Sequence, residues 1–184
     1  MARLSGNEAV AEWLAEHGAA TEISDVDRLV SACSRGDKAT ADALLRSYPD
    51  LARQIGPEHY GGLYRAAERN DAAVLETMLA CGFDPNHGDE IGKTALHAAA
   101  MEGWPDAVRV LLAHGASVSL RDSEFHGQPL VWAAEGFRSH DADHRDYRKV
   151  GEMLLEAGSP TDWEGLEEPS AEVLDIIREW SRPH

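Results

Sequence analysis

The chain has 184 residues, with 17 Lys or Arg against 33 Asp or Glu, so its formal net charge at pH 7 is −16. Phosphate backbones and anionic membrane surfaces repel such a polyanion, and we therefore expect neither a nucleic-acid partner nor a membrane partner. Hydrophobic residues make up 43% of the chain, enough for a folded core, and the longest uncharged stretch, residues 110–120, is shorter than the ~18 residues of a membrane span.

The amino-terminal segment and the two cysteines bear on the expected cellular location and on disulfide or metal binding. Residues 1–11 contain no basic stretch followed by an apolar run, so we expect no secretory signal and a cytoplasmic location. Cys33 and Cys81 lie 48 positions apart, which fits neither a metal-ligand spacing nor a disulfide framework. Free cysteines are mostly buried, so Cys33 is predicted to be a small core residue.

A repeat with a period of 33 or 34 residues runs along the chain. A step of 33 residues takes Leu63 to Leu96, and a further step of 34 leads to Leu130. A step of 34 residues backward from Leu63 leads to Leu29. Periods of 20 to 50 residues are typical of solenoids. The spacing predicts four consecutive units, at residues 22–55, 56–88, 89–121 and 122–160.

Each unit is predicted to contain two short helices followed by a turn. Small pairs such as Ala66-Ala67 recur at one place in the units and allow close helix packing, and Leu-Leu or Met-Leu pairs give the second helix an apolar stripe. Gly82, Gly115 and Gly158 follow the second helix as C-caps. Because neither helix buries its apolar face alone, the units must stack. The predicted fold class is all-α, a solenoid of helix-turn-helix repeats with short loop fingers.

The third unit resembles an ankyrin repeat. Residues 89–103 read DEIGKTALHAAAMEG and 110–116 read VLLAHGA, with Thr94 and His97 at the positions of the family's T-P-L-H signature. Residues 10–19 are similar to the second half of such a unit, and residues 172–180 to a closing helix. The resemblance implies one ankyrin-repeat domain over 1–184, with a half-repeat cap at 1–20 and a cap helix within 161–184.

The fourth unit is longer than the third. Fifteen residues separate Ala134 from Val150, whereas six separate Ala100 from Ala107, which places an insertion of nine residues at 136–147. Extra residues in repeat arrays normally form loops, often on the binding side. We therefore expect a loop here that contributes to binding.

The insertion also contains metal-ligating residue types. His140 and His144 would share one face of a helix, and Asp143 would add a carboxylate, a donor set suited to zinc. Charged loops are usually solvated, however, and no glutamate lies between the histidines, so we predict no metal and no cofactor. Ser139 precedes His140, but consecutive side chains diverge and do not form a catalytic triad.

The family resemblance implies that the turn tips and first helices form a concave groove that binds a protein. Trp104, Trp132 and Phe137 add aromatic candidates, although tryptophan is also mostly buried. Acidic groove residues and the net charge favour a basic partner, and solubility explains the same acids equally well. The implied groove positions are Tyr60, Glu68, Arg69, Glu90, Ile91, Lys93, Met101, Glu102, Ser123, Glu124, Phe125, His126 and Glu135.

The leading functional hypothesis is a non-catalytic, monomeric protein-interaction scaffold that binds through the groove and the insertion. The alternative is a small-molecule-binding protein or an enzyme in which the insertion covers the groove. In that case His126, His140 or His144 would approach a ligand held between Trp104 and Trp132. An enclosed pocket would favour the alternative, and an open groove would favour the scaffold.

Overall fold

The computed structural model describes residues 23–139, 145–161 and 170–182. Within these ranges the chain is helical, with one isolated antiparallel bridge between Gly88 and Thr94 and no β-strand, which confirms the all-α prediction. The helices are α2 (Asp25–Ser34), α3 (Lys38–Ser47), η1 (Leu51–Gln54), η2 (Pro57–His59), α4 (Gly61–Glu68), α5 (Ala72–Ala80), α6 (Ala95–Met101), α7 (Pro105–Ala113), α8 (Pro129–Ser139), α9 (Tyr147–Glu156) and α10 (Ala171–Trp180).

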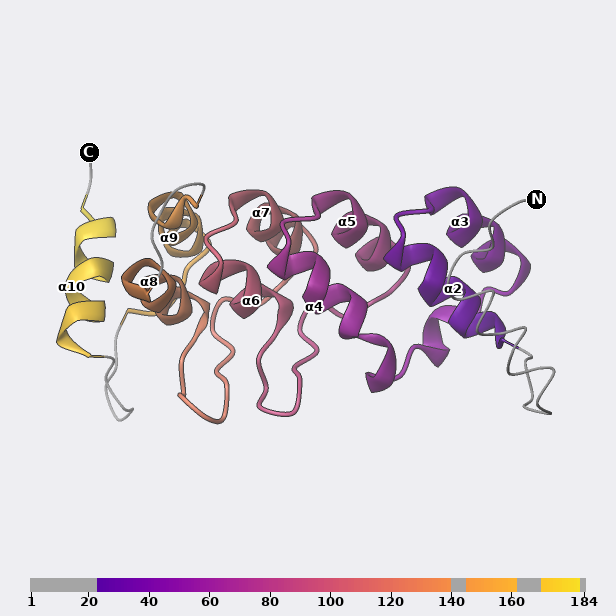
Figure 1. Ribbon diagram of the computed structural model, residues 1–184, viewed down its shortest axis with the longest axis horizontal. Helices are drawn as coiled ribbons and strands as arrows, with labels where there is room; N and C mark the ends of the chain where they lie inside the picture. Colours follow the sequence, from indigo (N-terminus) through magenta and orange to yellow (C-terminus); the bar gives the residue numbers. More distant parts are fainter. Residues whose placement is uncertain (1–22, 140–144, 162–169, 183–184) are drawn as a thin grey trace, which may run out of the picture.

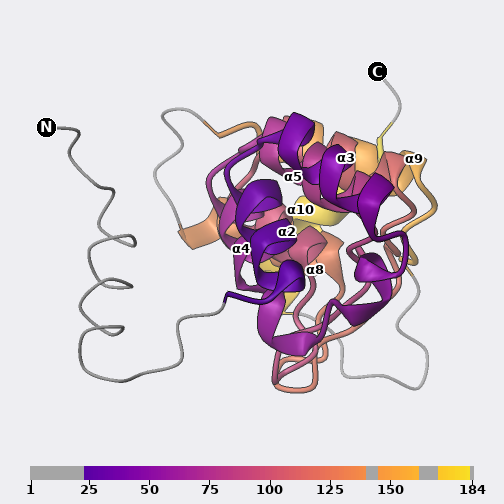
Figure 2. The same cartoon turned by 90° about the vertical axis from the view of Figure 1, so that its right-hand side faces the viewer.

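The helices are arranged in two rows. In Figure 1, α3, α5, α7 and α9 form the upper row, α2, α4, α6 and α8 lie below them, and α10 stands at the left-hand end. Two loops extend downward from the rows: finger 3, residues 83–94, and finger 4, residues 116–128. The view along the rows in Figure 2 shows successive units lying one behind the other. The described chain is thus a solenoid.

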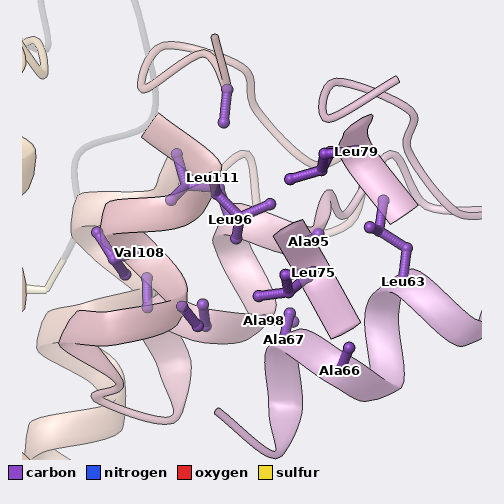
Figure 3. Packing of buried hydrophobic residues seen from close by; sticks show 14 of the residues in the cluster. Leu63, Ala66, Ala67, Leu75, Leu79, Ala95, Leu96, Ala98, Val108 and Leu111 are labelled. Atoms are coloured by element: carbon purple, nitrogen blue, oxygen red, sulfur yellow. The ribbon is translucent and has the colours of Figure 1, made fainter. Parts of the chain in front are cut away.

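The core is one continuous layer between the rows. Leu63, Leu96 and Leu130, which the repeat aligns with one another, are each completely buried. Figure 3 shows side chains from α4, α5, α6 and α7 meeting in this layer. Burial of one leucine stabilises the folded state by about 1.5–3 kcal/mol, so contacts between units supply most of the stability of these short helices.

Aspartate caps start most of the upper-row helices. Asp37, Asp71 and Asp146 each accept a hydrogen bond from the backbone N–H three residues later, at 3.1, 3.1 and 3.0 Å. Such a cap typically contributes about 1 kcal/mol. α7 begins instead with Pro105, which needs no hydrogen-bond partner at the first helical position.

The ankyrin signature of the third unit joins α6 to finger 4. His97 is buried, and its Nδ1 accepts hydrogen bonds from Thr94 N (3.1 Å) and Thr94 Oγ1 (2.8 Å). Because Nδ1 is an acceptor, Nε2 carries the proton and donates to the Gly127 carbonyl at 3.2 Å. Burial lowers the pKa of His97, which keeps the ring neutral. The histidine is therefore a structural residue.

Other side chains make the corresponding connections in the second and fourth units, which lack this signature. The Tyr64 hydroxyl donates to the His87 carbonyl at 3.2 Å. Gln128, at the position of Thr94, donates its side-chain amide to the Pro160 carbonyl. In both units the first helix, or the residue just before it, is thus joined to the loop that follows the second helix.

The nine additional residues of the fourth unit do not all form a loop. α8 has eleven residues and α6 has seven, so the insertion first lengthens the helix by about one turn. The prediction of a loop is therefore wrong for residues 136–139, which end α8, and for Tyr147, which begins α9. Gly136 is buried. A Cβ atom at Gly136 would lie 2.2 Å from the Met101 carbonyl oxygen, so glycine permits the lengthened helix to pass close to α6.

At the end of the insertion the chain returns to the third unit. Asp146 N donates to the Gly103 carbonyl at 3.0 Å, and α9 begins at the next residue. At the far end of the array, α10 buries Val173, Ile177 and Trp180 against the last unit. The predicted half-repeat at 1–20 lies outside the described residues, as do residues 140–144.

Candidate functional site

Finger 4 is built around the carboxylate of Asp122. This side chain is 1% exposed and accepts hydrogen bonds from Glu124 N (3.0 Å), Phe125 N (2.6 Å), Gly127 N (2.9 Å) and Trp132 Nε1 (2.9 Å). Burial alone would raise the pKa of Asp122, but the four donors outweigh it and hold the pKa below its ordinary value. One ionised carboxylate thus fixes both the finger and the Trp132 ring.

Finger 4 has one more residue than finger 3 between its aspartate and the following helix. His126 takes the left-handed conformation, with φ of 51°, where finger 3 has Gly92 with φ of 77°. A left-handed non-glycine residue costs energy and often marks a functional site. Its neighbour Phe125 is 64% exposed, the most exposed large hydrophobic side chain among the described residues.

The two fingers are hydrogen-bonded to each other. In finger 3, Asp89 Oδ1 accepts from Ile91 N at 3.1 Å and from Lys93 N at 2.9 Å. The Ile91 carbonyl then accepts from Ser123 N at 2.7 Å and from Ser123 Oγ at 3.1 Å. Because each finger has its own aspartate and shares these bonds, their tips form one continuous surface.

A hollow of about 520 Å³ lies between finger 4 and α8. Phe125 and Trp132 meet edge to face on one side of it, with ring centroids 5.9 Å apart and an angle of 73° between the rings. Phe125 and Ser139 are solvent-exposed, so the hollow opens to solvent. Its lining residues are Met101, Glu124, Phe125, Val131, Trp132, Glu135, Arg138 and Ser139.

The basic groups near the hollow already have acidic partners. Lys93 Nζ lies 3.6 Å from Glu68 Oε1 and 5.7 Å from the centroid of the Trp132 ring. Arg138 donates to Glu135 through Nε (2.9 Å) and Nη2 (2.7 Å). This pairing leaves their positive charge largely compensated.

Two acidic groups on the fingers are in a different situation. Glu90 of finger 3 and Glu124 of finger 4 are exposed, and neither carboxylate has a hydrogen bond or an ion pair with any residue that the structure describes. Among the charged residues that line the hollow, Glu135 and Arg138 pair with each other, so the uncompensated charge there is the negative charge of Glu124.

Trp104 and Glu102, both predicted as partner contacts, are engaged within the chain. Arg145 lies over the Trp104 ring at 5.8 Å and pairs with Glu102 at 3.1 Å. Trp104 Nε1 donates to the Glu68 carbonyl at 3.0 Å. These contacts attach the end of the insertion to the third unit.

Tyr60 and Phe137 are also engaged internally. Tyr60 is buried, stacks on His87 at 3.7 Å and accepts a hydrogen bond from Asp84 N at 3.0 Å, so its assignment as a partner contact is corrected to a support for finger 3. Phe137 is 46% exposed and packs edge-on against Tyr147 and Trp180. The sequence pattern gave no sign of these contacts because the partner residues lie ten or more positions away in the chain, beyond the reach of a local pattern.

The structure brings the two cysteines together. Cys33 of α2 and Cys81, just after α5, are both buried, and their side chains are close enough to affect each other's ionisation. The neighbouring Cys81 and burial raise the pKa of Cys33, which keeps it a thiol. Their separation of 48 positions concealed this contact, which only the stacking of α2 on α5 creates.

The described part of the chain contains no group of three or more His, Cys, Asp or Glu side chains placed to hold a metal ion. His140, Asp143 and His144 lie outside the described residues, and His126 is exposed on finger 4. Every helix within the described ranges is too short or too polar to serve as a membrane span.

Comparison with known proteins identifies the architecture. A family model described as ankyrin repeats (3 copies) matches residues 63–161. The chain is 31% identical over 133 residues to potassium channel AKT2/3 of Arabidopsis thaliana, 34% over 134 residues to BCL-6 corepressor-like protein 1 of Homo sapiens, and 30% over 116 residues to NF-kappa-B inhibitor delta of Mus musculus. These matches cover 68%, 70% and 55% of this chain, but only 16%, 7% and 36% of those proteins.

Proposed function

Because the chain belongs to the ankyrin-repeat family, we propose that it is a non-catalytic module that binds a partner protein through the groove surface, which comprises the tips of fingers 3 and 4 and the adjoining side chains of α4, α6 and α8. Ankyrin repeats typically mediate protein–protein interactions, and one relative is named as an NF-kappa-B inhibitor. The proposed groove residues are Glu68, Arg69, Glu90, Ile91, Lys93, Met101, Ser123, Glu124, Phe125, His126, Trp132 and Glu135.

The exposure of Phe125 is the observation that carries this proposal. A phenylalanine that is 64% exposed leaves most of its apolar surface in water, yet the buried Asp122 carboxylate fixes its backbone in place. Aromatic side chains held rigidly beside a hollow are typical of binding hot spots. The geometry favours binding of a partner at finger 4.

The insertion contributes to the same surface in this proposal. Its first residues lengthen α8, and Arg138 and Ser139 of the added turn line the hollow. Without the added turn, the first helix of the fourth unit would end before these two residues. The longer helix thus deepens the groove at finger 4.

The enzyme alternative has less support. The hollow opens to solvent, and the histidine that the structure describes there, His126, is exposed and lies outside the lining of the hollow. An open, aromatic hollow into which none of the described histidines projects favours recognition over catalysis.

Affinity purification with quantitative mass spectrometry tests the proposed function. The intact chain serves as bait in a lysate of its native cells, beside a groove variant, Ile91→Ser with Phe125→Ser, and a control variant, Ile23→Ser with Tyr48→Ser. The control removes two large hydrophobic side chains that are 60% and 51% exposed in the first unit. We expect the groove variant alone to lose the enriched proteins by tenfold or more. Equal recovery on all three baits, with equal melting temperatures, would contradict the proposal.

A further inference from the structure

We infer that the hollow between finger 4 and α8 binds a bulky apolar side chain of a partner peptide that carries Lys or Arg beside it. This inference rests on the proposed function and specifies the chemistry of the partner. Three features of the surface carry it: the chemical character of the hollow, the rigidity of its walls and the charge at its rim.

The hollow offers an apolar surface. The indole N–H of Trp132 already donates to Asp122 at 2.9 Å, so the part of the ring that lines the hollow offers dispersion and hydrophobic contacts. Phe125 faces this ring, and Met101 and Val131 complete the apolar lining. A volume of about 520 Å³ lies within the range of roughly 300–1,000 Å³ found for ligand pockets. A bulky apolar side chain fits within this volume and matches the apolar chemistry of the lining.

The walls of the hollow are fixed before any partner arrives. The four hydrogen bonds to Asp122 hold the backbone of Phe125 and the ring of Trp132. His126 remains left-handed because the surrounding bonds determine its conformation, including that from Arg121 Nη1 to its carbonyl at 2.7 Å. A preformed site loses little conformational entropy on binding, which favours affinity.

The rim of the hollow selects a cation. Lys93 and Arg138 are compensated by Glu68 and Glu135, whereas Glu124 on finger 4 has no such pairing with the described residues. The formal net charge of −16 adds a long-range field of the same sign. Complementary charge accelerates association and suppresses unsuitable partners, so the hollow favours Lys or Arg beside the apolar anchor. A second copy of this chain, with the same charge, would be repelled.

Selection from a random 12-residue peptide display library tests the inference with the full chain as target. The test variants are Phe125→Ser, which removes the apolar wall, and Glu124→Lys, which reverses the rim charge. Tyr48→Ser and Glu156→Lys are matched controls, because both residues are exposed on parts of the chain far from finger 4 in sequence. Glu124→Lys and Glu156→Lys raise the net charge by the same two units.

We expect the wild-type chain to enrich peptides with a large apolar residue next to Lys or Arg. Phe125→Ser should reduce their recovery at least tenfold, and Tyr48→Ser should leave it unchanged. Glu124→Lys should lower the preference for Lys or Arg at the flanking position severalfold while retaining the apolar residue. Glu156→Lys should keep the wild-type preference, which separates a contact at the rim from the general field.

Other outcomes overturn the inference in distinguishable ways. Enriched peptides that depend on Ile91 but neither on Phe125 nor on Glu124 would overturn this site and leave the proposed function standing. Equal effects of Glu124→Lys and Glu156→Lys would overturn the rim contact. Failure of the wild-type chain to enrich any peptide would count against both proposals. A dimer in light scattering that Phe125→Ser dissociates would assign the hollow to a second copy.

Discussion

The Tyr147 hydroxyl donates a hydrogen bond to the backbone carbonyl of Met101, 46 residues earlier, at 3.2 Å. One unit before it, Trp104 Nε1 donates to the Glu68 carbonyl at 3.0 Å. The two acceptors are one period of 33 residues apart, and both donors are aromatic side chains at the start of a second helix. The insertion therefore leaves the connection between neighbouring units intact.

Removal of this connection should destabilise the array. Tyr147→Phe keeps the buried ring but leaves the Met101 carbonyl without the hydroxyl donor and removes the acceptor for Arg145 Nη1. We expect a loss of about 1 kcal/mol in the free energy of unfolding, measured by urea denaturation. Tyr48→Phe is the matched control, because Tyr48 is 51% exposed, and it should change the stability by less than about 0.5 kcal/mol. An equal effect of the two variants would rule out a stabilising role for the connection.

The close approach of α8 to α6 predicts that an alanine will destabilise the chain despite its helix propensity. In Gly136→Ala the new methyl group would lie 2.2 Å from the Met101 carbonyl oxygen and 2.7 Å from Tyr147 Cε1, so the helices must separate. We expect a net loss of about 1–3 kcal/mol, because overpacking exceeds the gain of about 1 kcal/mol in propensity. Gly61→Ala should be tolerated, since its methyl group meets only the Arg65 guanidinium at 3.3 Å. Thermal melting of both variants decides between these outcomes.

Finger 4 should loosen when its central carboxylate is replaced. Asp122→Asn keeps the size of the side chain but replaces one acceptor oxygen with an N–H₂ group that faces N–H donors. We expect a loss of about 1–3 kcal/mol and faster amide hydrogen exchange at Phe125 and Gly127. Asp106→Asn, at an exposed site in α7, should leave exchange in finger 4 unchanged. Unchanged hydrogen exchange in Asp122→Asn would contradict this prediction, because the remaining contacts would then hold finger 4 without the carboxylate.

The neutral state of His97 predicts a loss of stability in mild acid. Its pKa in the folded state lies below the ordinary value of 6.5, so the unfolded chain binds the proton more readily. The stabilisation is complete above pH 6.5 and decreases as the pH falls toward the pKa of the folded state. His97→Gln should be less stable at pH 7 and should show a smaller decrease between pH 7 and pH 5 in urea titrations. Parallel stability curves for the two proteins would show that the histidine is not the titrating group.

The cysteine pair should be unreactive in the folded protein. Cys33 and Cys81 are 0% and 3% exposed, so a reagent cannot reach either sulfur atom in the folded chain. We expect iodoacetamide to label neither residue in the native chain and both in urea, as counted by intact-mass spectrometry. Rapid labelling of the native chain would show that the contact between α2 and the end of α5 opens readily.

The surface that we propose for binding could be predicted only in outline. Phe125, Trp132 and Glu124 were expected in or near the groove from their positions in the repeat, and the structure brings them to one hollow. Tyr60 was expected beside them, but it is buried under finger 3. Position in a repeat defines which element carries a residue, whereas exposure depends on the side chains that neighbouring units supply.

The sequence by itself determined the helices and their stacking. Leu63, Leu96 and Leu130 recur with the period of the repeat, and each unit must bury its apolar stripe against the next, so the solenoid follows from local pattern and hydrophobic burial. Only the tertiary structure showed that Gly136 allows α8 to lengthen and that Cys33 meets Cys81. These features depend on contacts between residues 35 and 48 positions apart, and no local periodicity contains that information.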